Sequence, residues 1–194
     1  MNYLYTLSPG QYHDADSLSI GFPYNNTKRT RINGLGEEGI SFINTGRDRD
    51  LGGAVLSLDT RDVNKLYLSF ITGTVLPNER VYGIRVQYRV GESEAFEDLP
   101  DESGDPVEYV RNKEAGHEVH VGPFQLPGKM TGHEVVQLLW RYYHISGDSG
   151  PRSELRLDDI WVGTSMSNLD VIPSSRQNSP AELALEQNYP NPFN

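Results

Sequence analysis

The feature that most constrains this chain is the strict alternation of apolar and polar side chains in its central part. In RVYGIRVQYRV, residues 80–90, every second side chain from position 82 onward is apolar. The segment HEVVQLLWRYYHI, residues 133–145, likewise places four apolar side chains on one face: Val136, Leu138, Trp140 and Tyr142. Because successive side chains of a strand point to opposite faces, each segment predicts a half-buried antiparallel strand.

Shorter segments with strand character occur along the rest of the chain, at 39–44, 52–60, 65–72, 106–110, 117–126 and 155–162. They are separated by clusters of Gly, Pro, Asn, Asp and Ser, which are typical of turns. No long amphipathic helix is indicated. About eight to ten short strands separated by turns predict an all-β fold, specifically a two-sheet antiparallel β-sandwich of jelly-roll-like topology. We expect this module to span residues 1–164.

The composition excludes several classes of function. The 194 residues suit one domain and a tail, and their formal net charge of −10 makes the chain a poor ligand for nucleic acid or anionic lipid. Cysteine is absent, which excludes disulfide scaffolds, thiol nucleophiles and Cys-based zinc sites. No apolar run approaches the roughly 18 residues of a membrane span, and no signal peptide is visible at the start. We therefore expect no nucleic-acid partner and no membrane insertion.

The sequence offers no pattern of catalytic residues. His117 and His120 point to opposite faces of a predicted strand, so they form a poor metal pair. No serine lies in a GxSxG motif and no HExxH motif occurs. Paired carboxylates in DESGD and GEEG lie in turns, without an apolar pocket to raise the pKa of either one. We expect that the protein is not an enzyme.

A candidate binding face is predicted on the polar sides of the two longest strands. If these strands are neighbours in one sheet, planar donors and an aromatic ring form a platform: Arg85, Gln87, Arg89, Gln137, Arg141 and Tyr143. Such a surface suits sugars, because planar side chains bond hydroxyls and aromatic rings stack on sugar C–H faces. Tyr109 and Trp161 are candidate additions to the platform. The alternative is that the arginines pair with acidic neighbours such as Glu108 or Glu154, and the face is structural.

The last thirty residues have the Ser-, Asn- and Pro-rich composition of a linker. They end in LEQNYPNPFN, which closely resembles the start of the C-terminal sorting signal of the type IX secretion system. We therefore interpret residues 165–194 as a linker leading into a truncated sorting signal. The resemblance implies export by the type IX machinery and an extracellular or outer-membrane-surface location.

Most of residues 28–163 resembles an accessory β-sandwich module of large exported bacterial proteins. The segments TRINGLGEEGISFINTG, RVYGIRVQYRVG, PVEYVRN and LLWRYYHISGDSGPRSELRLDDIWV carry this resemblance. The resemblance implies little about activity, because the module is an accessory domain.

A metal site is indicated at the predicted final strand. ELRLDDIWV also resembles the closing strand of jelly-roll carbohydrate-binding modules, where an Asp near this position often helps to hold a structural Ca²⁺. Asp158 and Asp159 supply the oxygen ligands that such an ion prefers. A β-bulge at this pair would return Ile160 and Val162 to the core side. The alternative is that the two carboxylates pair with Arg29, Arg31 or Arg156.

Two functions from different classes follow from these observations. The first is a non-catalytic structural or assembly module whose partners are copies of itself, as in a surface fibre. The N-terminal segment NYLYTL would then add an edge strand to a neighbour. The second is a carbohydrate-binding accessory module whose partner is a polysaccharide bound on the predicted platform.

Overall fold

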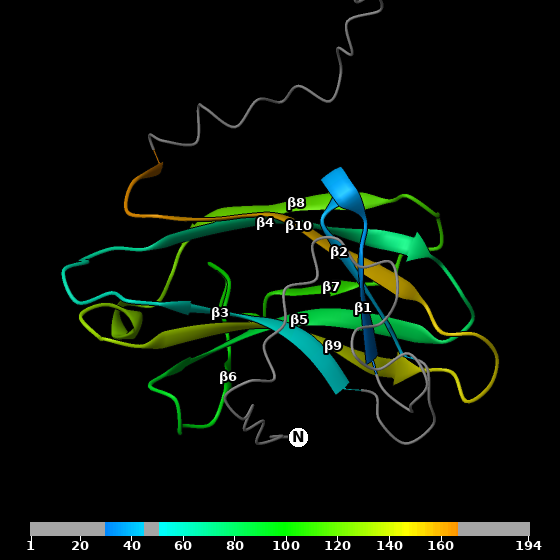
Figure 1. Ribbon diagram of the computed structural model, residues 1–194, viewed down its shortest axis with the longest axis horizontal. Helices are drawn as coiled ribbons and strands as arrows, with labels where there is room; N and C mark the ends of the chain where they lie inside the picture. Colours follow the sequence, from blue (N-terminus) through cyan, green and yellow to red (C-terminus); the bar gives the residue numbers. More distant parts are fainter. Residues whose placement is uncertain (1–29, 45–50, 167–194) are drawn as a thin grey trace, which may run out of the picture.

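A computed structural model describes residues 30–44 and 51–166. Ten strands form two antiparallel sheets that pack face to face (Figure 1). The segment NYLYTL lies outside the described residues, as does the predicted linker and sorting signal beyond residue 166. The expected all-β sandwich is confirmed, with only two short 3₁₀ turns, η1 (Gly36–Glu38) and η2 (Gly128–Met130), besides the strands of the described part.

Sheet A has the strand order β1-β2-β10-β4-β8. Sheet B has the order β3-β9-β5, and β6 and β7 pair one after the other with the remaining edge of β5. The strands of sheet A are β1 (Thr30–Gly34), β2 (Ile40–Asn44), β4 (Tyr67–Leu76), β8 (Glu118–Gln125) and β10 (Glu154–Gly163). Those of sheet B are β3 (Leu51–Leu58), β5 (Val81–Val90), β6 (Glu97–Asp98), β7 (Glu108–Val110) and β9 (Val136–Ser146).

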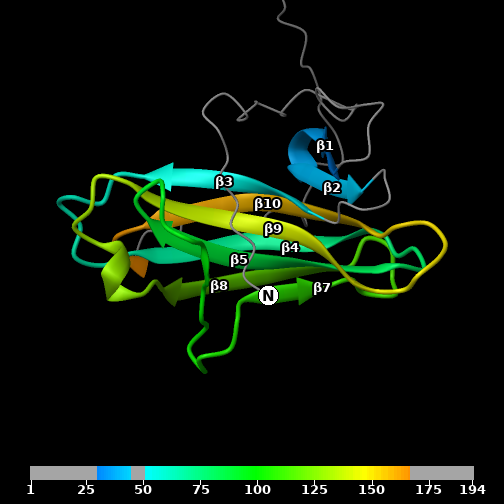
Figure 2. The same ribbon diagram turned by 90° about the horizontal axis from the view of Figure 1, so that it is seen from below.

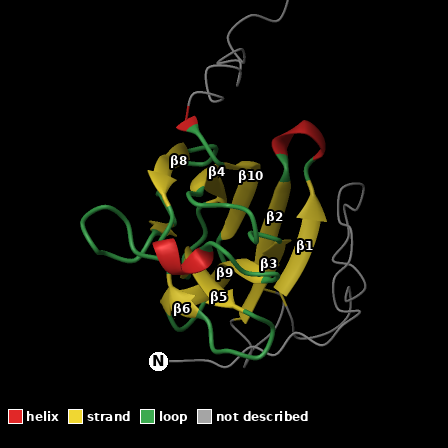
Figure 3. Cartoon of the chain, turned by 90° about the vertical axis from the view of Figure 1, so that its left-hand side faces the viewer, coloured by secondary structure: helices red, strands yellow, loops and turns green. Residues whose placement is uncertain are grey.

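The chain alternates between the two sheets, which is the jelly-roll arrangement expected from the sequence. From β2 to β5 each connection crosses from one sheet to the other, and the same holds from β7 to β10. Each sheet has a central pair of long strands, β4 with β10 in sheet A and β5 with β9 in sheet B. In sheet B the short strands β6 and β7 form the edge next to β5. Figures 2 and 3 show the two layers from below and from the end. The strands of the central pairs supply most of the core.

The core is built from the alternating residues that the sequence pattern assigned to one face. Val136, Leu138, Trp140 and Tyr142 of β9 are all fully buried, as are Tyr82 and Val86 of β5. Each fully buried large apolar side chain contributes about 1.5–3 kcal/mol to folding. Tyr82 stacks on Tyr142 with a centroid separation of 4.6 Å. The Tyr142 hydroxyl donates a hydrogen bond of 2.7 Å to the Ser153 carbonyl, which satisfies its polar end.

All eight strands expected from the sequence are present, and two were missed. β1 is not predicted, because its last two residues belong to the turn-rich segment NGLGEEG, yet it pairs with β2 over its full length. β6 has two residues, too short for any periodicity to be visible. β4 also runs four residues beyond the predicted end at Thr72, because Gly73 and Thr74 pair with β10. Within the described ranges, no helix is long and apolar enough to cross a membrane.

Candidate functional site

The two strands of the predicted binding face are neighbours in sheet B, as the prediction required. β5 and β9 pair along almost their whole length. Arg85 lies directly opposite Arg141, Arg89 opposite Gln137, and Gly83 opposite Tyr143. These side chains share the outer face of sheet B, because the alternate residues of both strands fill the core.

The half of this face that lies toward β6 is buried and internally bonded. Gln87, Arg89 and Gln137 are only 8%, 4% and 4% exposed. Arg89 Nε donates to Gln137 Oε1 at 2.7 Å, and its guanidinium lies 4.5 Å from the centre of the Phe96 ring. Gln87 Nε2 donates to Asp98 Oδ1 at 2.8 Å. The side chains of these three predicted residues are therefore occupied by contacts within the protein. The accessible part of the face contains the other three predicted residues, Arg85, Arg141 and Tyr143.

The accessible half centres on Arg85 and Tyr143. The Arg85 guanidinium forms ion pairs with Glu108 of β7 at 3.0 Å and with Asp98 of β6 at 3.2 Å. The Tyr143 hydroxyl reaches across β5 and donates to the same Glu108 carboxylate. Burial, and secondly this bond to Glu108, raises the pKa of Tyr143 to about 12. The alternative left open by the sequence, that the arginines pair with Glu108, holds for Arg85. Glu154 instead accepts from Ser41 and Asn33 of sheet A.

Gly83 makes room for the Tyr143 ring to cross β5. A Cβ atom at this position would lie 2.9 Å from Ile145 Cδ1 and 3.3 Å from Tyr143 Cε1, both closer than ordinary contact. Val110 of β7 pairs with Gly83 on the other side. Val110 and Ile145 are 44% and 39% exposed. The accessible half of the face therefore combines one aromatic ring, two arginines and two exposed aliphatic side chains.

Tyr109 and Trp161 do not join this face, so that part of the prediction is wrong. Tyr109 is 7% exposed and points inward, where its hydroxyl bonds Thr74 Oγ1 at 2.7 Å and His117 Nδ1 at 3.1 Å. Trp161 belongs to β10 of the opposite sheet. Tyr109 follows Glu108 in β7, so the strand period of two sends the two side chains to opposite faces.

The predicted calcium ligands lie on sheet A, next to an arginine. Asp158 accepts from Arg156 Nη2 at 3.2 Å, and the same guanidinium pairs with Glu118 at 3.3 Å and with Glu38. The alternative of ion pairing thus holds for Asp158. Among residues 30–44 and 51–166, no group of three or more His, Asp or Glu side chains is arranged to hold a metal ion. No observation tests the structural calcium ion predicted from the sequence at Asp158 and Asp159, but Arg156 already places a positive charge beside Asp158, which disfavours a second cation there.

The predicted β-bulge is present at this pair of aspartates. The pairing of β10 with β4 shifts between Asp158 and Trp161, and Asp159 adopts a φ of 46°. Beyond the shift, Val162 packs against the core as expected. Ile160 remains 40% exposed, so the expectation that it too would return to the core is wrong. It lies inside the bulge, where the alternation is interrupted.

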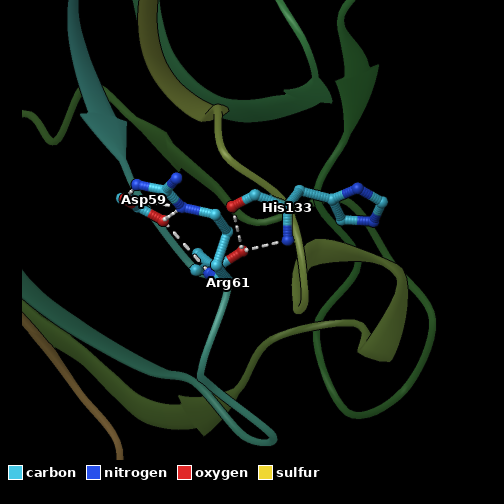
Figure 4. Close-up of polar contacts among 4 residues, drawn as sticks. Asp59, Arg61 and His133 are labelled. Carbon is cyan, nitrogen blue, oxygen red and sulfur yellow. Dashed lines mark hydrogen bonds and ion pairs between the residues drawn. The ribbon is translucent and has the colours of Figure 1, made fainter.

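A second polar cluster, drawn in Figure 4, joins the β3–β4 turn to the segment before β9. Asp59 and Arg61 form an exposed ion pair, and the Arg61 hydrogen bond lowers the pKa of Asp59. The buried Thr60 hydroxyl donates to the His133 carbonyl and accepts from the His133 N–H, both at 3.1 Å. The imidazole of His133 points away from the ion pair in Figure 4. These hydrogen bonds connect the two loops through the backbone of His133. The residues of the cluster do not place a general base next to a nucleophile.

The sequence alone did not identify several residues of the accessible face. Asp98 lies in the two-residue strand β6, and Val110 and Ile145 lie at strand ends, where alternation gives little information. Comparison with known proteins gives no further assignment, because no family model matches the chain and the searches of curated proteins and solved structures find no significant match.

Proposed function

We propose that this chain is a non-catalytic structural and assembly module of an exported cell-surface bacterial protein, and that its copies associate through the β7 edge of sheet B. The observation that carries the assembly proposal is the pair of exposed aliphatic side chains, Val110 and Ile145, beside this edge. Exposed apolar side chains at a free edge strand favour pairing with another chain.

The backbone of β7 supports the same proposal. Val107 accepts from Val86 N–H at 2.9 Å, and Arg111 donates to the Tyr82 carbonyl at 3.0 Å, so these residues bond toward β5. Because backbone groups alternate in direction along an antiparallel strand, those of Glu108 and Val110 face the opposite side. No strand within the described ranges pairs with that side. An added strand would supply the missing hydrogen bonds.

A cross-linking experiment tests this interface. Because the chain has no cysteine, Val110→Cys introduces a single thiol at the proposed contact. A short bis-maleimide should link two copies of this variant. Val119→Cys is the matched control, since Val119 is also exposed and lies on β8, the edge of the other sheet. Equal cross-linking of both variants, or none of the first, contradicts the proposed interface.

The proposed location rests on the sequence ending YPNPFN at residues 189–194. Its resemblance to the type IX sorting signal supports export of the parent protein to the cell surface. The test is protease treatment of intact cells that make the protein, followed by detection with antibodies against residues 30–166. Loss of antibody detection after protease treatment of intact cells supports surface exposure. Full protection, with digestion only after lysis, contradicts it.

The second candidate function is polysaccharide binding. The specific observation in its favour is that Arg85, Arg141 and Tyr143 come together on neighbouring strands of one accessible face. Screening the full chain against polysaccharides tests it, with Arg141→Ala and Tyr143→Ala as loss variants. Lys113→Ala serves as the control, because Lys113 is an exposed cation in the loop after β7, outside this face. Absence of binding to every polysaccharide rejects this candidate.

A further inference from the structure

The direction of the backbone groups in β7 limits how another strand can pair with its outer edge. Because Val107 and Arg111 bond toward β5, the N–H and C=O groups of Glu108 and Val110 point away from it. Hydrogen bonds to an added strand must therefore come from Glu108 and Val110. Pro106 precedes them by two residues and has no N–H, so the ladder is incomplete in that direction.

The side chains beside this edge differ in character at the two positions. Val110 is 44% exposed and lies on the outer face of sheet B, where Ile145 is also exposed. The Glu108 carboxylate is instead turned toward β5 and β9, where Arg85 and Tyr143 bind it. The edge therefore offers an apolar contact at Val110 and an ionised group at Glu108.

These side chains distinguish the registers in which an antiparallel copy of β7 could pair. Placing Glu108 opposite Glu108 of the second copy brings like charges together, and it sets Val110 opposite Pro106. Placing Glu108 opposite Val110 removes water from each carboxylate without supplying a new partner.

Placing Val110 opposite Val110 avoids both penalties, because two apolar side chains meet at the centre of the joint. Glu108 then lies opposite Asn112 of the second copy. Asn112 Oδ1 already accepts from the Glu114 N–H at 2.9 Å, which leaves its amide nitrogen as a donor for a carboxylate. Charge and polarity therefore favour the register that is centred on Val110.

Strand β8, the edge of sheet A, is less suited as the partner of β7. Pro123 lies inside β8 and has no N–H, and Gly122 before it adopts a φ of 85°. A proline and a glycine of positive φ interrupt the flat ladder that an added strand needs. A second copy of β7 therefore fits the free edge better than β8 does.

We propose that two copies of this chain pair through β7 in antiparallel orientation, with Val110 opposite Val110 on a two-fold axis. This inference rests on the proposed assembly through β7 and specifies its partner strand, register and symmetry. The two Val110 residues exchange both backbone hydrogen bonds, so sheet B continues from one copy into the other. A two-fold interface uses the same surface of both copies, so it closes at a dimer. A surface fibre would require a second contact outside β7.

Disulfide formation by Val110→Cys in a glutathione redox buffer, without a linker, tests the register. Directly opposite residues of a hydrogen-bonded antiparallel pair have Cα atoms about 5.5 Å apart, within the range of about 4.4–6.8 Å that a disulfide spans. A shift of two residues would place the same Cα atoms at diagonal positions, about 7–8 Å apart. We expect an interchain disulfide in Val110→Cys and none in Val119→Cys, the exposed control on β8.

The outcomes separate this inference from the proposed function. If a bis-maleimide links Val110→Cys but no disulfide forms, the register is wrong and assembly through β7 stands. If neither reaction links two copies, assembly through β7 is contradicted as well. Sedimentation velocity of the wild type should stop at two copies, and species that grow beyond a dimer with concentration overturn the closed two-fold arrangement.

Asn112→Asp tests the register through charge. This variant places a carboxylate opposite Glu108 of the second copy at both ends of the joint, and it keeps the oxygen that accepts from the Glu114 N–H. The two like-charge pairs should weaken the dimer about tenfold. Asn64→Asp is the matched control, because Asn64 is exposed in the turn before β4. Unchanged dimer affinity in Asn112→Asp, or an equal loss in Asn64→Asp, overturns the register.

Discussion

Arg85 of β5 lies directly opposite Arg141 of β9 on the outer face of sheet B. Like charges at directly opposite positions of an antiparallel pair are unfavourable. The arrangement is compensated on one side, where Glu108 and Asp98 lie 3.0 and 3.2 Å from the Arg85 guanidinium. Glu108 also accepts the Tyr143 hydroxyl, so a single carboxylate from a three-residue strand organises the accessible face.

Replacing Glu108 with glutamine should lower the free energy of unfolding by about 1 kcal/mol, because a partly exposed ion pair and a hydrogen bond are weakened together. Urea denaturation measures this change. The control is Glu102→Gln, whose exposed carboxylate pairs with no arginine in the described structure and should be neutral within error. An equal loss in both variants would show that Glu108 has no special role.

Tyr143 should titrate with a pKa near 12, well above its ordinary value of 10.0. The folded state therefore binds this proton more tightly than the unfolded state does. The resulting stability is present below pH 10 and is lost as the pH rises from 10 toward about 12. Ultraviolet absorbance of tyrosinate measures the titration, as the difference between the wild type and Tyr143→Phe. A difference curve centred near pH 10 would contradict a half-buried hydroxyl that is hydrogen-bonded to Glu108.

Gly83→Ala should destabilise the fold by about 1–3 kcal/mol through overpacking. The added Cβ would meet Ile145 Cδ1 at 2.9 Å and the Tyr109 carbonyl oxygen at 3.1 Å. Gly128→Ala is a suitable control, because the space around Gly128 is open. In thermal unfolding, Gly83→Ala should have a clearly lower unfolding temperature than Gly128→Ala. A Gly83→Ala protein as stable as the control would mean that the Tyr143 ring does not need the space over β5.

Arg156→Ala should lower the free energy of unfolding by about 2–3 kcal/mol. The loss is smaller than for a fully buried ion pair, because two of the carboxylate partners of Arg156 are half exposed.

We also expect the wild-type unfolding temperature to be the same in Ca²⁺ and in EDTA, since Arg156 already provides a positive charge beside Asp158. Calorimetry in the two buffers measures this. A calcium-dependent rise in the wild type would support the structural calcium predicted from Asp158 and Asp159.

Much of the fold was predictable from the sequence, because strand alternation depends on local periodicity. The buried faces of β5 and β9 follow directly from the pattern. The interrupted alternation also indicated the bulge at Asp158 and Asp159, although Ile160 stays exposed. The two missed strands had no such periodicity: β6 is too short, and β1 lies in a segment rich in turn residues. Their positions depend on pairing with distant strands, which a local pattern does not encode.

The accessible part of the predicted binding face was only half predictable from the sequence. Periodicity correctly placed Arg85, Arg141 and Tyr143 on one side of neighbouring strands. It could not show that Phe96 packs on Arg89, because this contact comes from the loop before β6. Exposure of a sheet face is a tertiary property, and the same alternation describes a solvated face and a covered one.

Sedimentation velocity of the full chain, over a wide range of protein concentration, tests the assembly proposal most directly. We expect species heavier than the 21.8 kDa monomer to grow with concentration. Val110→Lys should abolish them, because a charge at the β7 edge opposes pairing with another copy. A strictly monomeric wild type of 21.8 kDa at every concentration would contradict the proposal that copies of this module associate.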